Sequence, residues 1–208
     1  MFYEQDRENV LRFGDALKGF LSVTPVIKQP ILEAHHNDYN IDINLPIFSV
    51  VLSPCCSIDE GTISLSPFIP VRQAFFENPY FVEDLTRINR KMVPEQSLSP
   101  QVWKKLLPEE RQQRLEKGMA YVFVELFVYE KNDLFPNYTV HRKKGNLETK
   151  YYMIDFRNTY KINCESLKEN PVEAKCLQLS VQTRSELREK IAYYYGRVPK
   201  EDAVLLGE

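Results

Sequence analysis

Two adjacent cysteines follow the most apolar segment of the chain, in the order Ser53-Pro54-Cys55-Cys56. A cysteine thiolate is a nucleophile, and it forms when a neighbouring base or cation lowers the pKa of the thiol. Ser53, Cys55 and Cys56, the thiol turn, are therefore the first candidate site. No histidine lies near this turn in the sequence, and free cysteine is among the most frequently buried residue types. The alternative is that these small side chains fill a corner of the core.

A second candidate site is a basic run that begins with a histidine, His141-Arg142-Lys143-Lys144, with Arg157 further along the chain. Cationic side chains stabilise phosphate groups, and a histidine transfers protons near neutral pH. His141, Arg142 and Arg157 are thus the residue types that a ribonuclease needs. Charge runs also occur at solvated hairpin tips, which is the alternative interpretation.

Zinc-binding residue types are present, but their spacing does not predict a metal site. The chain has no Cys-x-x-Cys pair, and the interval from Cys164 to Cys176 is too long for a zinc knuckle. We therefore predict neither a metal nor another cofactor. The residues with suitable donor atoms are Cys55, Cys56, Cys164, Cys176, His35 and His36.

Two aromatic clusters have the composition of either a binding surface or a core. Residues 119–130 place Phe127 and Tyr129 on one face of an expected strand, where aromatic rings can stack on bases. The opposite face of that strand is apolar as well, which favours a core position. Tyr193, Tyr194 and Tyr195 near the end of the last helix either pack or contribute to a protein interface.

Short strands are the elements expected to position these residues. β-branched and aromatic residues between turn formers predict strands at residues 16–26, 46–52, 62–66, 119–130 and 150–157. We expect the segments near positions 50, 65 and 125 to be neighbouring strands of one curled sheet or barrel. Because both its faces are apolar, 119–130 is predicted to be a central strand. Residues 33–40 are predicted to be a polar loop.

Helices are predicted in two regions. Residues 73–118 are polar and charged, with proline at the first helical position after Ser99 and acidic residues after Pro108. This region is predicted to be a helical insertion between strands. The last helix is predicted to begin at a capping box, Thr183 to Glu186, and to end at Gly196. Its apolar stripe would contain Leu187, Ile191, Tyr194 and Tyr195.

Composition limits the class of protein. The 208 residues fit one domain, 1–208, and 43% hydrophobic residues provide ample material for a core. The formal charge of -2 argues against nucleic-acid binding over the whole surface, although a local basic patch is compatible with it. No run approaches the roughly 20 apolar residues that cross a bilayer. With a polar first segment, these features predict a cytoplasmic protein without membrane contact.

Three features, in this order, resemble bacterial PemK/MazF-like proteins, whose fold is an SH3-like barrel. They are the Gly14-Asp15 turn, the apolar strand and turn at residues 50–58, and a last helix that ends in aromatic residues at 191–197. The resemblance covers residues 13–71 and 119–197. It implies an α+β fold in which a small β-barrel carries the 73–118 insertion and a C-terminal helix.

The chain departs from the toxin pattern of that group at two places. The toxins have an Arg-Pro before the second strand, where this chain has Leu45-Pro46. The wider group has Ser-x-x-Cys-Asp, where this chain has the thiol turn followed by Ser57. The resemblance therefore implies an accessory or protein-interaction component of a toxin-antitoxin or antiphage-type system, without its own catalysis and with a protein partner. The alternative is an endoribonuclease of the same fold, which would bind RNA and use His141, Arg142 and Arg157.

Overall fold

The structure, a computed structural model, describes residues 1–27, 39–54, 58, 62–90, 98, 100–117, 123–163 and 172–196. The chain divides into two compact units. Unit 1 contains Met1–Ile69 and Arg157–Ser180, and unit 2 contains Pro70–Phe156 and Val181–Glu208. Each unit thus combines two separate stretches of sequence. That residues 1–208 form one domain stays a prediction.

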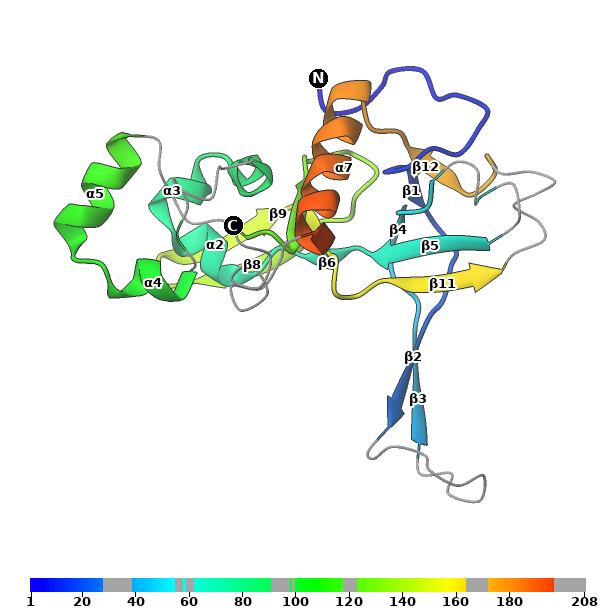
Figure 1. Cartoon of the computed structure of the whole chain (residues 1–208), viewed down its shortest axis with the longest axis horizontal. Coiled ribbons are helices and arrows are strands. Elements are labelled where there is room, and N and C mark those ends of the chain that lie inside the picture. Colours follow the sequence, from blue (N-terminus) through cyan, green and yellow to red (C-terminus); the bar gives the residue numbers. More distant parts are fainter. Residues whose placement is uncertain are drawn as a thin grey trace, which may run out of the picture. The chain divides into compact units, whose positions relative to one another are not determined.

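Unit 1 is built on an antiparallel sheet whose strand order is β11-β5-β4-β1-β12. A separate hairpin pairs β2 with β3. Figure 1 shows this hairpin projecting away from β4, β5 and β11. The strands are β1 (Ala16–Leu17), β2 (Ser22–Ile27), β3 (Tyr39–Asn44), β4 (Ser49–Val51), β5 (Thr62–Pro67), β11 (Tyr160–Asn163) and β12 (Lys175–Leu177).

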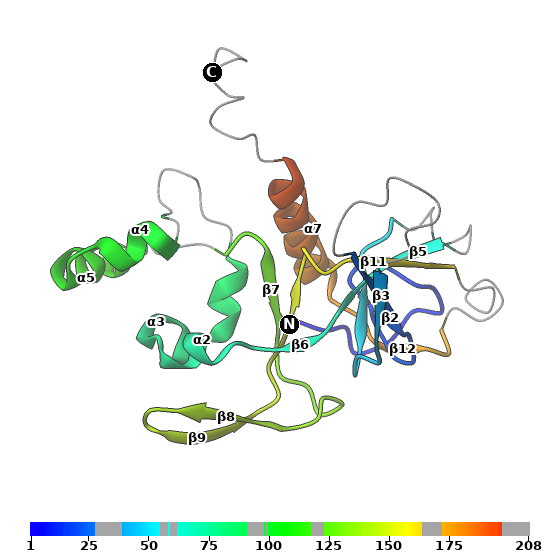
Figure 2. The ribbon, with the colours of Figure 1, turned by 90° about the horizontal axis from the view of Figure 1, so that it is seen from below.

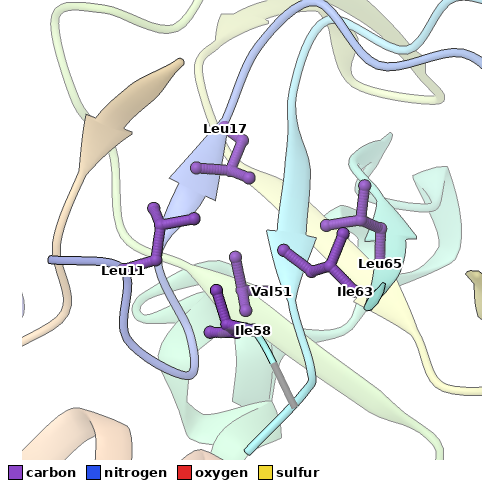
Figure 3. Close-up of a cluster of buried hydrophobic side chains, with 6 residues drawn as sticks. All are labelled: Leu11, Leu17, Val51, Ile58, Ile63 and Leu65. Atoms are coloured by element: carbon purple, nitrogen blue, oxygen red, sulfur yellow. The ribbon is translucent and has the colours of Figure 1, made fainter. Parts of the chain in front are cut away.

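The core of unit 1 follows from the alternation of side chains along its strands. On β5, Ile63 and Leu65 point to one face and are fully buried, as expected for a period of two residues. Leu17 and Val51 meet them from β1 and β4. Figure 3 shows these four side chains directed toward one another, with Leu11 and Ile58 completing the cluster.

A buried lysine fastens the first residues of the chain to β12. The Nζ atom of Lys175 lies 2.8 Å from Oδ2 of Asp15, and both side chains are 0% exposed. The same Nζ donates to the backbone oxygens of Glu8 at 3.2 Å and Val10 at 2.8 Å, and to Oε1 of Gln178 at 2.6 Å. Residues 1–12 contain no helix, and the bonds to Glu8 and Val10 hold part of this segment against β12.

The main sheet of unit 2 has the strand order β6-β10-β7, and a hairpin pairs β8 with β9. Figure 2 shows β8 and β9 running side by side beyond β7. Every residue of β7 and β10 is buried, so these strands form the core of the unit. The strands are β6 (Ile69–Pro70), β7 (Leu126–Tyr129), β8 (Tyr138–Arg142), β9 (Gly145–Thr149) and β10 (Tyr152–Asp155). The boundary between the units falls within β6, because Ile69 is assigned to unit 1 and Pro70 to unit 2.

The helices whose bounds the structure describes lie in unit 2, and those between residues 73 and 117 confirm the predicted helical character of that region. Pro100 and Pro108 are the first residues of their helices, as predicted from the restricted φ of proline. Among the described residues, no helix combines the length and apolarity needed to cross a bilayer. The helices are α2 (Gln73–Glu77), α3 (Pro79–Val82), the 3-10 helix η1 (Leu85–Asn89), α4 (Pro100–Lys105), α5 (Pro108–Glu116) and α7 (Val181–Gly196).

The α+β class is confirmed, and the prediction of antiparallel pairing between the strands near positions 50 and 65 is confirmed by β4 and β5. The prediction that the segment near 125 neighbours them is wrong, because β7 pairs with β10 in another sheet and another unit. Among the strands that the structure describes, β7 is also an edge strand rather than a central one. No closed barrel is present in the part of the chain that the structure describes.

Three local predictions also need correction. The strand expected at 16–26 is divided into β1 and β2, because the chain turns at Gly19, whose φ of +90° favours glycine. Tyr39 and Asn40, predicted to belong to a polar loop, are the first residues of β3, and residues 33–38 lie outside the described residues. The capping box is misplaced, since α7 begins at Val181 and Thr183 is buried in its first turn.

An asparagine protects the edge of β7. Asn89, the last residue of η1, donates from Nδ2 to the backbone oxygen of Val128 at 2.6 Å. Its Oδ1 accepts from the backbone N–H of Val128, also at 2.6 Å. The side-chain amide therefore takes the place of a neighbouring strand at Val128, and it satisfies two backbone groups at an edge with which no other described strand pairs.

We predict that Asn89→Ala lowers the free energy of unfolding by about 2 kcal/mol, because it leaves the buried N–H and C=O of Val128 without these partners. Urea unfolding followed by circular dichroism measures the change. Arg90→Ala, at the neighbouring exposed position, should change the free energy by less than about 0.5 kcal/mol. Equal stability of both variants would contradict the role of Asn89.

Candidate functional site

The β2–β3 hairpin has one polar and one apolar face. Its register places Val23 opposite Ile43 and Pro25 opposite Ile41, and directly opposed residues share a face. Continuing the register places Leu21 opposite Leu45. The aliphatic side chains on this face, termed the apolar face, are 47–68% exposed; they are Leu21, Val23, Ile41, Ile43 and Leu45. The polar face carries Ser22, Thr24, Asn40, Asp42 and Asn44.

A cavity of about 590 Å³ lies at the base of this hairpin. Its lining comes from residues 22–24, 44–46, 67–69 and 157–160, all of which belong to unit 1. Arg157 provides a positive charge to this lining, and no lining residue among those described is acidic. The cavity, termed the basal pocket, shares Val23 and Leu45 with the apolar face.

One wall of the basal pocket is fixed by a hydrogen bond between two strands. The hydroxyl of Tyr160, at the start of β11, lies 2.7 Å from the Oγ of Ser49 on β4. Burial raises the pKa of Tyr160, although the bond to Ser49 partly opposes that shift. The phenol therefore stays neutral at physiological pH and acts as a hydrogen-bonding wall of the pocket rather than as a base.

The predicted ribonuclease residues are divided between the two units. His141 and Arg142 end β8 in unit 2, where Nδ1 of His141 lies 2.9 Å from Oδ1 of Asn146. Arg157 follows β10 and lines the basal pocket of unit 1. Neither unit by itself contains all three side chains, so their joint action in catalysis stays a prediction.

A second, smaller cavity lies beside the tip of the β8–β9 hairpin. Its volume is about 390 Å³. The cationic residues of the predicted basic run meet Phe76 and Glu77 of α2 and Val82 of α3 there. The lining residues from the tip are Arg142, Lys143 and Lys144. The interpretation of this run as an exposed hairpin tip is confirmed, since His141, Lys143 and Lys144 are exposed.

The structure describes only part of the thiol turn. Ser53 is buried, and its Oγ accepts from the backbone N–H of Ser64 at 2.6 Å, which joins the end of β4 to β5. Cys55 and Cys56 lie outside the described residues, so the nucleophile hypothesis stays a prediction. Cys164 also lies outside them. Burial raises the pKa of the Cys176 thiol, which keeps that sulfur protonated and weakly nucleophilic near neutral pH.

The two aromatic clusters have different environments. Phe127 and Tyr129 are fully buried on β7, so the core interpretation is confirmed and base stacking at these rings is excluded. On α7, Tyr194 contacts Phe156 with ring centroids 5.7 Å apart, and Tyr195 donates to the backbone oxygen of Phe156 at 3.1 Å. Tyr193 remains exposed.

The residues of the apolar face were not among the predicted site residues. Their signal is the alternation of aliphatic and polar residues from Ile41 to Leu45, which continues to Ile47. The alternation predicts a strand with one apolar face, whereas nothing in it indicates whether the protein's own core covers that face. No family model, curated protein or solved structure matches the chain.

Proposed function

We propose that this chain is a protein-interaction component that binds another protein through the apolar face of the β2–β3 hairpin. The observation that carries this proposal is the exposure of Val23, Ile41 and Ile43 on one face of a regular hairpin, with Leu21 and Leu45 also exposed directly beyond its paired residues. Soluble proteins seldom leave contiguous apolar surface in water unless a ligand or a partner covers it. The polar groups of the opposite face keep the other side solvated.

The stability of the hairpin supports the same function. Two strands without a further strand or helix against them are marginally stable in water. In the described residues, β2 and β3 belong to no larger sheet. A partner that covers Val23, Ile41 and Ile43 would remove their surface from water, and it would supply the third layer that the hairpin lacks.

β3 also offers a backbone edge to a partner. Its residues, Tyr39–Asn44, include no proline, whereas β2 contains Pro25, which has no N–H to donate. Extended segments of other proteins commonly add to such edges, where main-chain hydrogen bonds provide affinity and side-chain contacts provide specificity. The partner is therefore expected to approach β3 rather than β2.

We extend the proposal to kinship with PemK/MazF-like proteins and to an accessory role in a toxin-antitoxin or antiphage-type system. The support is limited to unit 1. Phe13 and Gly14 form a turn that leads through Asp15 into β1, and the antiparallel pair β4–β5 follows in the order of the resemblance. An SH3-like arrangement would be confined to this unit, because β7 lies in unit 2.

A charge placed on the apolar face tests the interaction. The full chain is used to capture proteins from lysate of its own source cells, and a captured protein is identified, purified and titrated by calorimetry. We expect Ile43→Asp to weaken the binding of that purified protein by at least about tenfold, because the carboxylate would be buried against apolar surface. Asn40→Asp introduces the same charge on the polar face and should leave the affinity within about twofold.

Two results would contradict the proposed function. The first is a purified partner whose affinity is the same for Ile43→Asp and Asn40→Asp. The second is a dimer of the free protein, measured by light scattering, that Ile43→Asp dissociates; the apolar face would then be covered by a second copy. Circular dichroism of both variants checks that the fold of unit 1 is retained.

The basic tip of the β8–β9 hairpin favours a second candidate function, which is RNA binding or cleavage. Three cations line its cavity against one carboxylate, that of Glu77, and such charge attracts phosphate groups. Incubation with labelled RNA tests this candidate. Cleavage that His141→Ala abolishes would support the endoribonuclease alternative, and an absence of both binding and cleavage would reject it.

A further inference from the structure

We infer that the tip pocket, the second cavity beside the β8–β9 hairpin, binds a nucleotide through its phosphate monoester. This chemistry is shared by the phosphorylated end of an RNA strand and by a free nucleoside monophosphate. The inference rests on the second candidate function, RNA binding by the basic tip, and it names the group that is recognised. The described lining lies wholly within unit 2 and consists of Phe76, Glu77, Val82, Arg142, Lys143 and Lys144.

A tight turn brings the three cations of the tip pocket together. The register of the hairpin pairs Arg142 with Gly145, so Lys143 and Lys144 alone connect β8 to β9. Gly145 has a φ of +103°, which glycine adopts without strain. β8 also lies against α2, which contributes to the opposite part of the lining. The backbone therefore holds three successive cations at one wall of the pocket.

The cations of the tip pocket are available to a ligand. Lys143 and Lys144 are exposed, and neither ammonium group has an ion pair or a hydrogen bond with any described residue. Arg142 donates from Nε to the backbone oxygen of Gly145 at 3.4 Å, a bond that occupies one of the five N–H groups of its guanidinium. Within the described residues, no carboxylate forms an ion pair with these cations, so an anionic ligand displaces no acidic partner.

The number of cations favours a phosphate monoester over an anion with a single charge. A monoester carries about 1.5–2 negative charges at pH 7 and has three strong acceptor oxygens. A carboxylate carries one charge, and so does each phosphate within an RNA strand. The planar fork of Arg142 can bind two oxygens of one phosphate, and the lysine ammonium groups bind it as point charges. Within an RNA strand, only a phosphorylated end carries a monoester.

The other lining residues favour a nucleotide among the ligands that carry a phosphate monoester. Phe76 and Val82 provide an apolar wall, and Val82 is 43% exposed, so a planar base can lie against it. Oε1 of Glu77 accepts from Nε2 of Gln73 at 3.1 Å, while Oε2 accepts no bond from a described residue. A carboxylate accepts from ribose hydroxyls and base amino groups, which a phosphorylated serine side chain lacks.

The volume of the tip pocket limits the ligand to about one nucleotide. Cavities that bind small molecules commonly measure about 300–1,000 Å³, and the tip pocket measures about 390 Å³. A strand would therefore place its last nucleotide in the pocket, with the remaining nucleotides outside it. The terminal nucleotide and its phosphate should then provide most of the affinity.

Strands that differ only at their ends test this inference. Short fluorescent RNA strands of one sequence, labelled in the middle, are prepared with a 5′-phosphate, with a 3′-phosphate or with a hydroxyl group at both ends. Fluorescence anisotropy measures their affinity for the full chain. We expect at least one phosphorylated strand to bind about tenfold more tightly than the strand with two hydroxyl ends, because that strand lacks the doubly charged group.

Titrations of small ligands distinguish the sources of the phosphate. The four nucleoside 5′-monophosphates and the matching nucleosides are titrated into the full chain by calorimetry. We expect the monophosphates to bind and the nucleosides to bind at least about tenfold more weakly. A monophosphate that binds as tightly as the phosphorylated strand would assign the pocket to free nucleotides, and a weaker one would assign it to strand ends. A phosphoserine peptide with blocked ends should bind at least about tenfold more weakly than the monophosphates.

Two pairs of adjacent lysines provide matched variants. Lys143→Gln combined with Lys144→Gln removes two cations of the pocket and should reduce the preference for the phosphorylated end to less than about threefold. Lys104→Gln combined with Lys105→Gln removes the same charge from exposed positions of α4, outside the described lining, and should retain the preference. Circular dichroism checks that both variants keep the fold of unit 2.

The outcomes separate the inference from the second candidate function. Equal affinity for all strands, lost in the Lys143 and Lys144 variant, would overturn the inference and leave RNA binding at the tip. A preference for phosphorylated ends that this variant retains would overturn the assignment to the tip pocket. A phosphoserine peptide that binds as tightly as the monophosphates would overturn the choice of a nucleotide. An absence of binding by the strands and by the monophosphates would overturn both proposals.

Discussion

Lys175→Met is expected to lower the free energy of unfolding by about 3–5 kcal/mol, which is typical when one partner of a buried ion pair is removed. The Asp15 side chain would remain buried but lose the ammonium that lies 2.8 Å away. The backbone oxygens of Glu8 and Val10 would lose a donor as well. Chemical denaturation followed by intrinsic fluorescence measures the loss.

Matched variants show whether the loss of stability in Lys175→Met comes from the buried Asp15 carboxylate or from the loss of the lysine side chain itself. Lys161→Met removes an exposed lysine of β11 and should change the free energy by less than about 0.5 kcal/mol. The double variant Asp15→Asn, Lys175→Met leaves no uncompensated charge, so it should be more stable than Lys175→Met alone. A double variant whose loss equals the sum of the two single losses would contradict the ion-pair explanation.

The stability of the protein is expected to rise by about 3 kcal/mol between pH 7 and pH 9.5, because of one lysine in unit 2. Burial lowers the pKa of Lys190 from 10.5 to about 7, and the Glu125 carboxylate opposes that shift only in part. Nζ of Lys190 donates to the backbone oxygen of Ile88 in η1. At a pH between these two pKa values, Lys190 is protonated in the unfolded chain and neutral in the folded chain. Unfolding therefore takes up a proton, and a rising pH makes unfolding less favourable.

Denaturation at several pH values measures this rise, and Lys190→Met should abolish most of it. Lys105→Met, which removes an exposed lysine of α4, should retain it. The series ends at pH 9.5 because burial raises the pKa values of Tyr151, Tyr152 and Tyr160. Above their unfolded value of 10.0, such tyrosines favour the unfolded state. A stability that does not change with pH in the unaltered chain would contradict the assigned environment of Lys190.

Local signals in the sequence account for the elements that could be predicted. Pro108 with two following glutamates predicts the start of α5 because the fixed φ of proline and the helix dipole act within one turn. The alternation in residues 62–66 predicts β5 for a similarly local reason. At residues 39–44, Asn and Asp favour turns while Ile41 and Ile43 alternate, and the pairing with β2 decides in favour of a strand.

Long-range contacts account for what could not be predicted. The assignment of β7 to a sheet depends on its pairing with β10, more than twenty residues away. Asn89 and Lys175 are unremarkable in the sequence, because their partners are brought to them only by the fold. The basic run and the distant Arg157 belong to different units, so the phosphate site suggested by these residue types stays a prediction.

The order in which the units alternate along the chain has a consequence for biosynthesis. Residues 157–180 complete unit 1 only after most of unit 2 has been made, and residues from 181 onward complete unit 2 afterwards. Neither unit can therefore reach its final contacts while the ribosome is still translating the middle of the message. Contacts between distant positions in the sequence slow folding. We therefore expect strands of the nascent chain to stay unpaired and exposed until the last segments have been made, a state to which chaperones commonly bind.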